Sequence, residues 1–464
     1  MKRTAGRSFM QLKWSLHAIR RKLGIDRAVA FGSFSTVWGA VGGSVSILLI
    51  ALRFSPEVQG YYYTFNSLLA LTTFVELGLG TVIQQFASHE WARLDLDSGK
   101  GVVGDANALS RLASLARVSF RWYGFAGALA VIGLGAGGVV FFAQRPSPGI
   151  QWVGPWLVLC GLSGMRLVLV PAWSLLDGCD QMRHTNAARL GIAVVTNLFA
   201  WAAIVLGAGL WTLVILNGAN LAVAAAFFAR RYGDFFRAIR SSPRHAAVDW
   251  RLEIWPMQWR IALSWLSGYF IFSLFTPVMF QFHGAIVAGQ MGMTLSLANA
   301  LLAFALTWVA TKAPAFGQLI SLRDFAGLDR LFAASTAQAL AVGGIGALAI
   351  LGGTYGLNAI HSRLALRLLP PLLVGLFVVS ALIATLVGAM ATYLRAHKRE
   401  PYLVPSVLCG VAVGVTTIVL GGRYGALGAA IGYLVLSLVF LIPEVAIFRH
   451  CQSAWHVTDE GASG

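Results

Sequence analysis

Long apolar segments recur along the whole chain, and they constrain the fold more than any other feature of the sequence. A helix needs about 20 consecutive apolar residues to cross the hydrocarbon core of a bilayer. About twelve segments meet this requirement, and they cover approximately 28–52, 61–87, 120–143, 151–177, 188–208, 211–230, 260–282, 285–311, 332–355, 366–393, 402–420 and 425–448. With 57% hydrophobic and only 11% charged residues, the sequence predicts an all-α polytopic membrane protein.

The sequence indicates two halves of six helices each. Gly60 and Ser67 recur as Gly289 and Ser296, each pair near the start of the second span of its half. The string IVLG also occurs twice, ending a fifth span each time. Because each half contains an even number of spans, both enter the membrane from the same side, as parallel repeats do.

We therefore expect two lobes of transmembrane helices. The N-lobe is predicted at 28–230 and the C-lobe at 258–449, with a basic linker at 231–257 between them and a short tail at 450–464. The longest connection has about thirty residues, which is too short to bury a core of its own. No separate soluble domain is predicted.

Most of the 35 lysine and arginine residues fall on one side of the predicted spans. The exceptions are Arg53, Arg145, Arg363, Arg367 and Arg423 on the other side and Arg166 inside a span. Basic residues mark cytoplasmic connections. Both termini are therefore predicted to be cytoplasmic.

The first 27 residues combine basic and apolar side chains at helical spacing. Apolar residues recur at Phe9, Leu12, Leu16, Ile19 and Leu23, among lysines and arginines. This pattern predicts an interfacial helix lying on anionic membrane lipids. The alternative is a disordered basic tail.

Two charged residues are predicted at the same depth inside the membrane. Glu76 lies about 15 residues from the start of its span, or about 22 Å along a helix that rises 1.5 Å per residue. Arg166 lies about 14 residues into a span that runs in the same direction. A charge at mid-bilayer is costly unless it contacts protein or water, so both side chains are expected to face a lobe interior or a hydrated cavity.

Two interpretations of Glu76 and Arg166 remain open. In the first, they form an ion pair that connects the second and fourth spans. In the second, Arg166 supplies positive charge to a cavity for an anionic substrate, while Glu76 tunes that charge or carries a coupling proton.

Other polar residues inside the spans are less specific. Asp177 is a second candidate for a coupling ion, although a solvated helix end explains it better. Lys312 is a further candidate for the substrate cavity, although it is expected to reach the cytoplasmic surface. Gln84, Asn197 and Gln290 could contact substrate in a cavity, but interhelical hydrogen bonds are the commoner role of such side chains. The triplet Tyr61, Tyr62 and Tyr63 is expected in an aromatic belt at the outer interface.

The sequence offers no pattern for catalysis, metal binding or nucleic-acid binding. The four cysteines have no CxxC spacing, and no HExxH or GxSxG motif is present. The segment LDSGKGVV lacks the first glycine and the Ser or Thr of a phosphate-binding loop. The basic residues are dispersed between apolar spans and form no nucleic-acid patch. We expect a non-enzyme without a cofactor or resident metal.

Two segments carry a family resemblance. "RFSPEVQGYYYTFNSLLALTTFVELGLGTVIQQFASHEWARL" at 53–94 and "TYLRAHKREPYLVPS" at 392–406 resemble bacterial polysaccharide-lipid flippases. These are the O-antigen and exopolysaccharide transporters of the multidrug/oligosaccharidyl-lipid/polysaccharide (MOP) superfamily. In topology the resemblance covers nearly the whole chain.

The resemblance implies two six-helix lobes around a central cavity. It implies movement of an undecaprenyl-pyrophosphate-linked oligosaccharide from the cytoplasmic to the periplasmic leaflet, and association with polysaccharide assembly proteins. The family carries cations in that cavity, and Arg166 is the intramembrane arginine of this chain. Coupling to a proton or Na⁺ gradient and removal of the flipped product remain alternative energy sources.

The sequence leaves two other functions open. A cation-coupled multidrug exporter of the same superfamily would use Glu76 as its coupling site. A polytopic enzyme that transfers or polymerises lipid-linked sugars would need acidic residues on a sizeable outer loop, and the predicted outer connections are only a few residues long.

Overall fold

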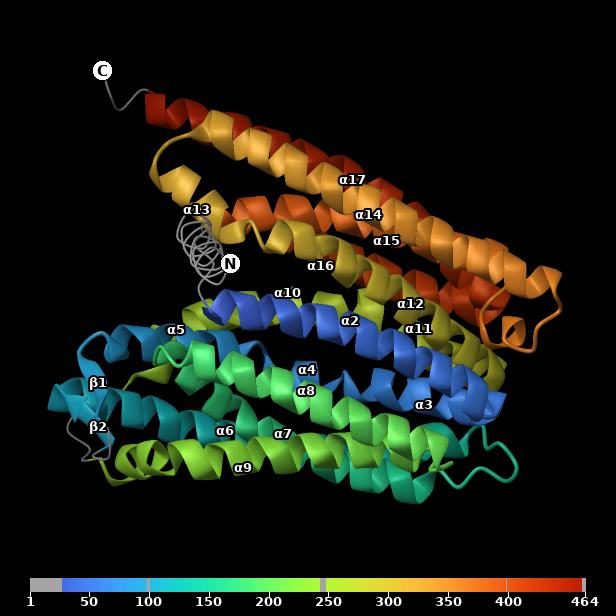
Figure 1. Cartoon of the computed structure of the whole chain (residues 1–464), viewed down its shortest axis with the longest axis horizontal. Coiled ribbons are helices and arrows are strands. Elements are labelled where there is room, and N and C mark those ends of the chain that lie inside the picture. The colour runs from blue at the N-terminus through green and yellow to red at the C-terminus, as the bar shows by residue number, and fades with distance from the viewer. Residues whose placement is uncertain (1–26, 98–100, 243–247, 398, 461–464) are drawn as a thin grey trace, which may run out of the picture.

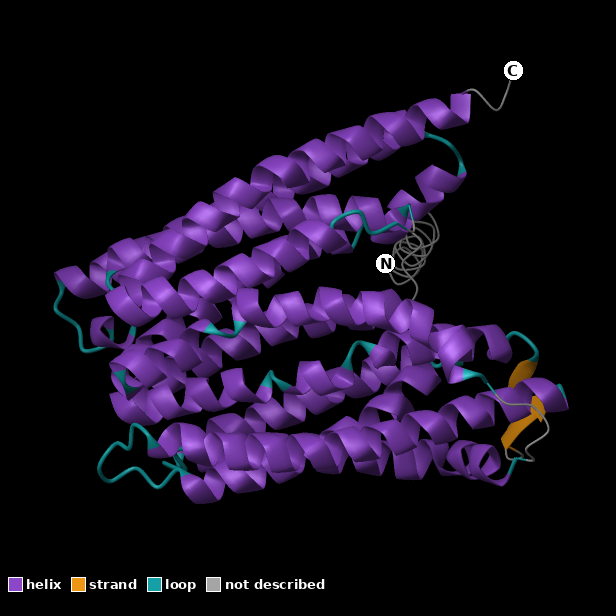
Figure 2. Ribbon diagram, turned by 180° about the vertical axis from the view of Figure 1, so that it is seen from behind, coloured by secondary structure: helices purple, strands orange, loops and turns teal. Residues whose placement is uncertain are grey.

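The structure is a computed structural model that describes residues 27–97, 101–242, 248–397 and 399–460. Helices account for nearly all of these residues (Figure 2), which confirms the predicted all-α polytopic class. The predicted interfacial helix before Arg27 lies outside the described residues, as do positions 243–247 of the linker and 461–464 of the tail.

The first half of the chain contains the helices α2 to α9 and one short β-hairpin. In order, these elements are α2 Arg27–Arg53, α3 Pro56–Leu69, α4 Thr72–Glu76, α5 Leu79–Trp91, β1 Leu94–Asp97, β2 Gly101–Gly104, α6 Ala106–Ala143, α7 Val153–Gly178, α8 Met182–Val205 and α9 Trp211–Ser241. The antiparallel strands β1 and β2 pair Leu94 with Gly104 and Asp97 with Gly101. The sequence pattern does not predict this hairpin.

The second half contains the helices α10 to α17, with short irregular helices between some of them. In order, these elements are η1 Trp250–Ile254, α10 Trp255–Phe272, α11 Phe275–His283, α12 Ala285–Ala310, α13 Ala313–Ser321, α14 Phe325–Ala359, η2 Ala365–Arg367, α15 Pro371–Ala396, α16 Leu403–Thr416, η3 Thr417–Gly421 and α17 Gly422–Glu460.

The predicted spans all correspond to helices or broken helices. Among the described residues, 8 helices are long and apolar enough to cross a membrane, or 9 if the bent pair Pro56–Glu76 and Leu79–Trp91 is one span. One of them, Leu403–Trp455, contains a reversal at Gly425, where φ is 64°. Gly428 packs back against Leu420 there, so α16 and α17 form two antiparallel spans. The other predicted spans, 28–52 and 260–282, are α2 and the broken pair α10–α11.

The helices form two bundles. In the first bundle, α2 packs beside α8, α6 beside α7 and α8 beside α9. In the second bundle, α12 packs beside α14 and α15, α15 beside α17, and α10 beside α16. This is the predicted arrangement of two six-helix lobes.

The two ends of the molecule differ, and we name them by their residues. The basic end carries the β1–β2 hairpin, η1 and the end of α17, and the closed end carries the starts of α3 and α12 and the connections 144–152 and 360–370. The bundles lie against each other at the closed end and diverge toward the basic end in both ribbon views (Figures 1 and 2).

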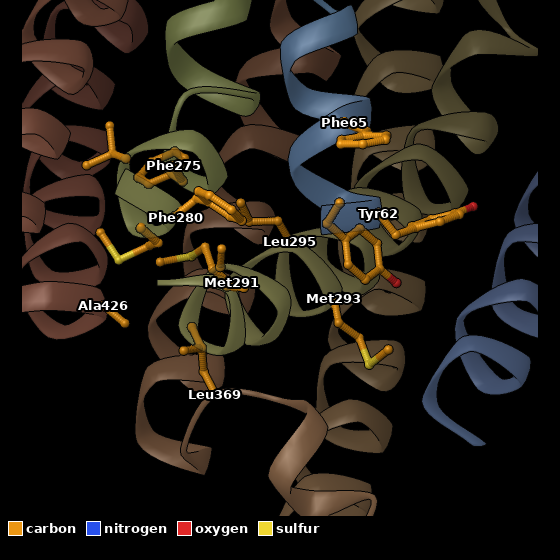
Figure 3. Close-up of a cluster of buried hydrophobic side chains, with 14 of the residues drawn as sticks. Tyr62, Phe65, Phe275, Phe280, Met291, Met293, Leu295, Leu369 and Ala426 are labelled. Atoms are coloured by element: carbon orange, nitrogen blue, oxygen red, sulfur yellow. The ribbon is translucent and has the colours of Figure 1, made fainter. Parts of the chain in front are cut away.

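One apolar cluster joins the two bundles at the closed end. Figure 3 shows Tyr62 and Phe65 of α3 beside Phe275 and Phe280 of α11 and Met291 of α12. All three tyrosines of the triplet are buried, with exposed fractions of 0%, 8% and 7% for Tyr61, Tyr62 and Tyr63. The expectation of an aromatic belt is therefore wrong for this triplet, because contacts between the bundles take up the rings that would otherwise face the lipid headgroups.

Candidate functional site

The candidate site begins at a break in the second predicted span. The helix stops at Glu76, and α5 begins at Leu79 after a bend of 45° between the two helical parts. Leu77 and Gly78 both adopt the left-handed conformation, with φ of 51° and 64°. A non-glycine residue in this conformation is strained, and such strain concentrates at functional sites. Transporters place broken helices of this kind around their binding sites.

Glu76 lies over the first turn of α5. A β-carbon placed on Gly80 would lie 3.5 Å from Glu76 Oε1, 3.4 Å from Val170 Cγ1 and 3.1 Å from Ser174 Oγ. No side chain caps the start of α5. Because the free N–H groups at a helix start favour a negative charge, this position explains why the span contains an acid.

Tyr123 of α6 completes the polar lining behind Glu76. The residue is fully buried, with an exposed fraction of 0%. Its hydroxyl has no hydrogen-bond partner among the described residues. The hydroxyl lies near the main chain of Gly80 and in the electrostatic field of Glu76. The Tyr123 hydroxyl and the Glu76 carboxylate therefore lie in one polar region around the start of α5.

Arg166 of α7 approaches the same region. Its side chain is exposed, although surrounding protein partly desolvates the guanidinium. The field of Arg166 acts on Glu76. Within the described residues, Arg166 forms neither an ion pair nor a hydrogen bond. The structure thus brings the two predicted residues together without the ion pair that the first interpretation requires.

Asp177 is engaged at the basic end of the first bundle. Its carboxylate accepts hydrogen bonds from Arg189 Nη2 at 2.6 Å and from the Thr185 hydroxyl at 2.5 Å. Both partners come from α8, so this acid connects α7 and α8.

The remaining sequence candidates lie away from Glu76. Asn197 of α8 contacts Gly42 of α2, which makes it an interhelical group. Gln84 lies in α5, one turn beyond Gly80, and its main-chain oxygen contacts Gly178. Gln290 and Lys312 lie near opposite ends of α12; Gln290 Nε2 donates to the main-chain oxygen of Leu366 at 3.0 Å.

The closed end contains polar contacts that the sequence pattern does not predict. Gln59 of α3 is 1% exposed, and its Nε2 donates to the oxygens of Gly289 at 2.9 Å and Arg367 at 3.0 Å. Arg367 Nη2 donates to the oxygen of Phe54 at 2.5 Å. Each of these bonds crosses from one bundle to the other, and no local sequence signal pairs residues so far apart in the chain.

The second bundle contains a small apolar pocket and a buried acid. The pocket is lined mainly by apolar side chains, with Asn299 and Tyr433 as its polar members. Glu444 of α17 is 7% exposed, and the Tyr402 hydroxyl donates to its main-chain oxygen at 2.8 Å. Within the described part of the chain, no group of three His, Cys, Asp or Glu is placed to hold a metal ion.

Comparison with known proteins reveals similar solved structures. A multidrug resistance transporter of the MATE family and MOP superfamily, in an inward-facing conformation, matches with a TM-score of 0.64 and 14% identity over 91% of this chain and 96% of that chain. An outward-facing conformation of such a transporter matches with a TM-score of 0.56 and 14% identity, over 94% of this chain and 98% of that chain. The lipid II flippase MurJ, in an inward closed conformation, matches with a TM-score of 0.61 and 12% identity, over 90% of this chain and 87% of that chain.

No protein-family model and no curated protein matches the chain. The likeness to the solved structures spans nearly the full length of each chain, and at 12–14% identity it establishes the fold. The fold is thus one that multidrug transporters and a lipid flippase share.

Proposed function

We propose that this chain moves a lipid-linked oligosaccharide or polysaccharide precursor across the bacterial inner membrane, for surface polysaccharide synthesis. The observation that carries the proposal is Arg166, an exposed arginine within the apolar helix α7, with no ion pair to Glu76 in the described structure. An unneutralised cation at this depth is expensive. The phosphate group of a lipid-linked sugar is the kind of ligand that would offset that cost.

The basic end is assigned to the cytoplasm. It gathers Arg93 between α5 and α6, Arg183 in the first turn of α8 and Arg251 between α9 and α10, which is the distribution expected of the cytoplasmic side. Both termini then lie in the cytoplasm.

Rocking of the lobe 28–230 against the lobe 258–449 is the proposed mechanism. The bundles pack together at the closed end, so in this mechanism a polar headgroup enters from the basic, cytoplasmic end while its lipid tail stays in the bilayer. Breaking the contacts of Gln59 and Arg367 would then open the other side. Solved neighbours in inward-facing and outward-facing conformations support such a cycle for this fold.

The proposed ligand is an undecaprenyl-pyrophosphate-linked glycan, handed on to polysaccharide assembly proteins. No cofactor, nucleic acid or chemical step is part of the proposal. Either a proton or Na⁺ gradient or removal of the flipped product drives transport from the cytoplasmic to the periplasmic leaflet.

Reconstitution tests this function. Purified protein in vesicles with an undecaprenyl-pyrophosphate-linked sugar should make the sugar accessible to a glycosidase on the far side. Arg166→Gln should slow that transfer at least about tenfold, the loss expected for one charge-assisted contact. Arg183→Gln, on an exposed position of α8, is the matched control. Equal rates for vesicles with and without protein would refute the proposal.

A multidrug exporter is the second candidate, favoured by the similarity to a multidrug resistance transporter and by Glu76 in a broken helix. Glu76 would then be the coupling site. Glu76→Gln should abolish drug resistance in an efflux assay and leave surface polysaccharide intact if this candidate is right. Loss of surface polysaccharide in Glu76→Gln, with drug resistance unchanged, supports the flippase.

A further inference from the structure

Arg367 occupies a special position between the two bundles at the closed end. It ends η2 in the second bundle, and its Nη2 donates to the Phe54 oxygen at the end of α2 in the first bundle, at 2.5 Å. The Arg367 oxygen in turn accepts from Gln59 Nε2 at 3.0 Å. The residue therefore contacts the opposite bundle through both its side chain and its main chain.

The hydrogen-bonding capacity of this guanidinium is only partly used. Nη1 is buried and has no partner among the described residues, and the same holds for Gln59 Oε1. The Phe54 acceptor is a neutral carbonyl. Glu57 is the charged group whose field reaches Arg367, but no ion pair joins them in the described structure. Arg367 is half-buried, and with one neutral acceptor and a buried Nη1 that has none in the described structure, it uses only part of its hydrogen-bonding capacity.

Arg367 is one of three cations that lie at different levels between the basic end and the closed end. Lys312 lies beyond the basic end of α12, and Arg166 lies at mid-depth in the first bundle. Arg367 lies beside the closed end of α12, since Gln59 binds both Gly289 and Arg367. In the proposed mechanism, an anionic headgroup passes from the level of Lys312 to that of Arg166 and then to that of Arg367.

We propose that Arg367 is a second anion-binding residue, which binds the phosphate or pyrophosphate group of the transported lipid once the closed end opens. This inference rests on the proposed flippase function. When α3 separates from α12, the Phe54 oxygen moves away and the planar guanidinium becomes free for bidentate contact with phosphate. Phe54 and the anion then compete for one group, so bound anion holds the closed end open and its release allows closure.

The test needs a variant whose closed end is open. Gly60 packs against the main-chain oxygen of Ala285 with no room for a β-carbon, so Gly60→Leu forces α3 away from α12. Inorganic pyrophosphate is titrated against the purified full-length protein by calorimetry. We expect Gly60→Leu to bind pyrophosphate about tenfold or more tightly than Gly60→Leu with Arg367→Gln, because a hydrogen bond to a charged group contributes about 1.5–3 kcal/mol.

Arg363→Gln in the Gly60→Leu background is the control, since Arg363 is an exposed cation on the same connection. It should leave the affinity unchanged. If Gly60→Leu does not fold, Gly289→Leu opens the same contact from α12. Equal pyrophosphate affinities with and without Arg367 would overturn the inference.

The failures of the two proposals can be told apart. If wild-type protein transfers a lipid-linked sugar in vesicles and Arg367→Gln leaves pyrophosphate binding by the opened variant unchanged, the second site is refuted and the function stands. If wild-type protein transfers no lipid-linked sugar, the function fails, and with it the role assigned to Arg367.

Discussion

Gly289 of α12 packs against Gly60 of α3 so closely that a β-carbon on Gly289 would lie 2.9 Å from the Gly60 nitrogen and 3.2 Å from the Pro56 oxygen. The two glycines hold matching positions in the two halves of the sequence, each one turn after the start of its helix. These two glycines, which match between the halves of the sequence, are therefore neighbours in the structure. Because small residues let membrane helices approach closely, this contact brings the polar groups of Gln59 within reach of the opposite bundle.

Gln59→Ala should shift the protein toward a state that is open at the closed end. The substitution removes three contacts of Gln59 Nε2 across the bundles, with the Gly289 and Arg367 oxygens and the Met293 sulfur, a loss of about 1–3 kcal/mol. A cysteine at Met293, which is 2% exposed in the wild type, should then react faster with a membrane-impermeant thiol reagent. Asn66→Ala is the control, because Asn66 bonds within its own helix. Equal labelling rates in both variants would show that Gln59 does not hold this end closed.

A double-variant cycle separates the two interpretations of Glu76 and Arg166. If they formed a structural ion pair, each single change to Gln would leave a lone charge and cost about 3–5 kcal/mol, and the double change would recover much of the loss. Since no ion pair joins them in the described structure, we expect small shifts in melting temperature for both single variants. Transport should fall with Arg166→Gln and stay low in the double variant. Recovery of stability and transport by the double variant would restore the ion-pair interpretation.

Glu253 predicts a specific pH dependence of stability. Arg111 of α6 binds Glu90 of α5 at 2.7 Å and Glu253 of η1 at 2.6 Å. The main-chain N–H of Asp249, followed by the Arg111 guanidinium, holds the pKa of Glu253 below its usual value. The ionised form is therefore favoured by folding, so its contribution is fully present above about pH 4.3, the ordinary pKa of a glutamate. The contribution is lost as the pH falls through the lower pKa of the folded state.

The measurement compares wild type with Glu253→Gln by thermal unfolding in detergent. The wild type should be more stable by about 1 kcal/mol at pH 6–8, and the difference should shrink below about pH 4. Asp234→Asn removes a well-exposed pair with Arg237 and should change little at either pH. A difference between wild type and Glu253→Gln that grows on acidification would contradict the assignment.

The sequence predicted the features that the thickness of the bilayer determines, namely the position of the spans and the depth of the charges inside them. A bilayer requires long apolar helices, so spans such as 120–143 could be located from hydropathy and length alone. The depth of Glu76 and Arg166 followed from counting along those spans, and the structure does bring them together.

The missed features depend on tertiary contacts. The left-handed conformation of Leu77 cannot be read from a leucine, because only packing around the break imposes it. Tyr123 gave no local signal, since its importance comes from lying beside a carboxylate on another helix. The tyrosine triplet was misplaced because an aromatic cluster at a span edge suits both a lipid interface and a contact between bundles.

The orientation of the chain can be tested independently of its cargo. The connection 144–152 lies at the closed end, and the one around Ser242 lies at the basic end. If basic residues mark the cytoplasm, alkaline phosphatase fused after Ser147 should be active, because it folds outside the inner membrane, and a fusion after Ser242 should be inactive. A fluorescent protein fused after Gly464 should fluoresce. The reverse pattern would place the basic end outside the cell and make the proposed direction of transport untenable, because a lipid-linked sugar made in the cytoplasm would meet the closed end first.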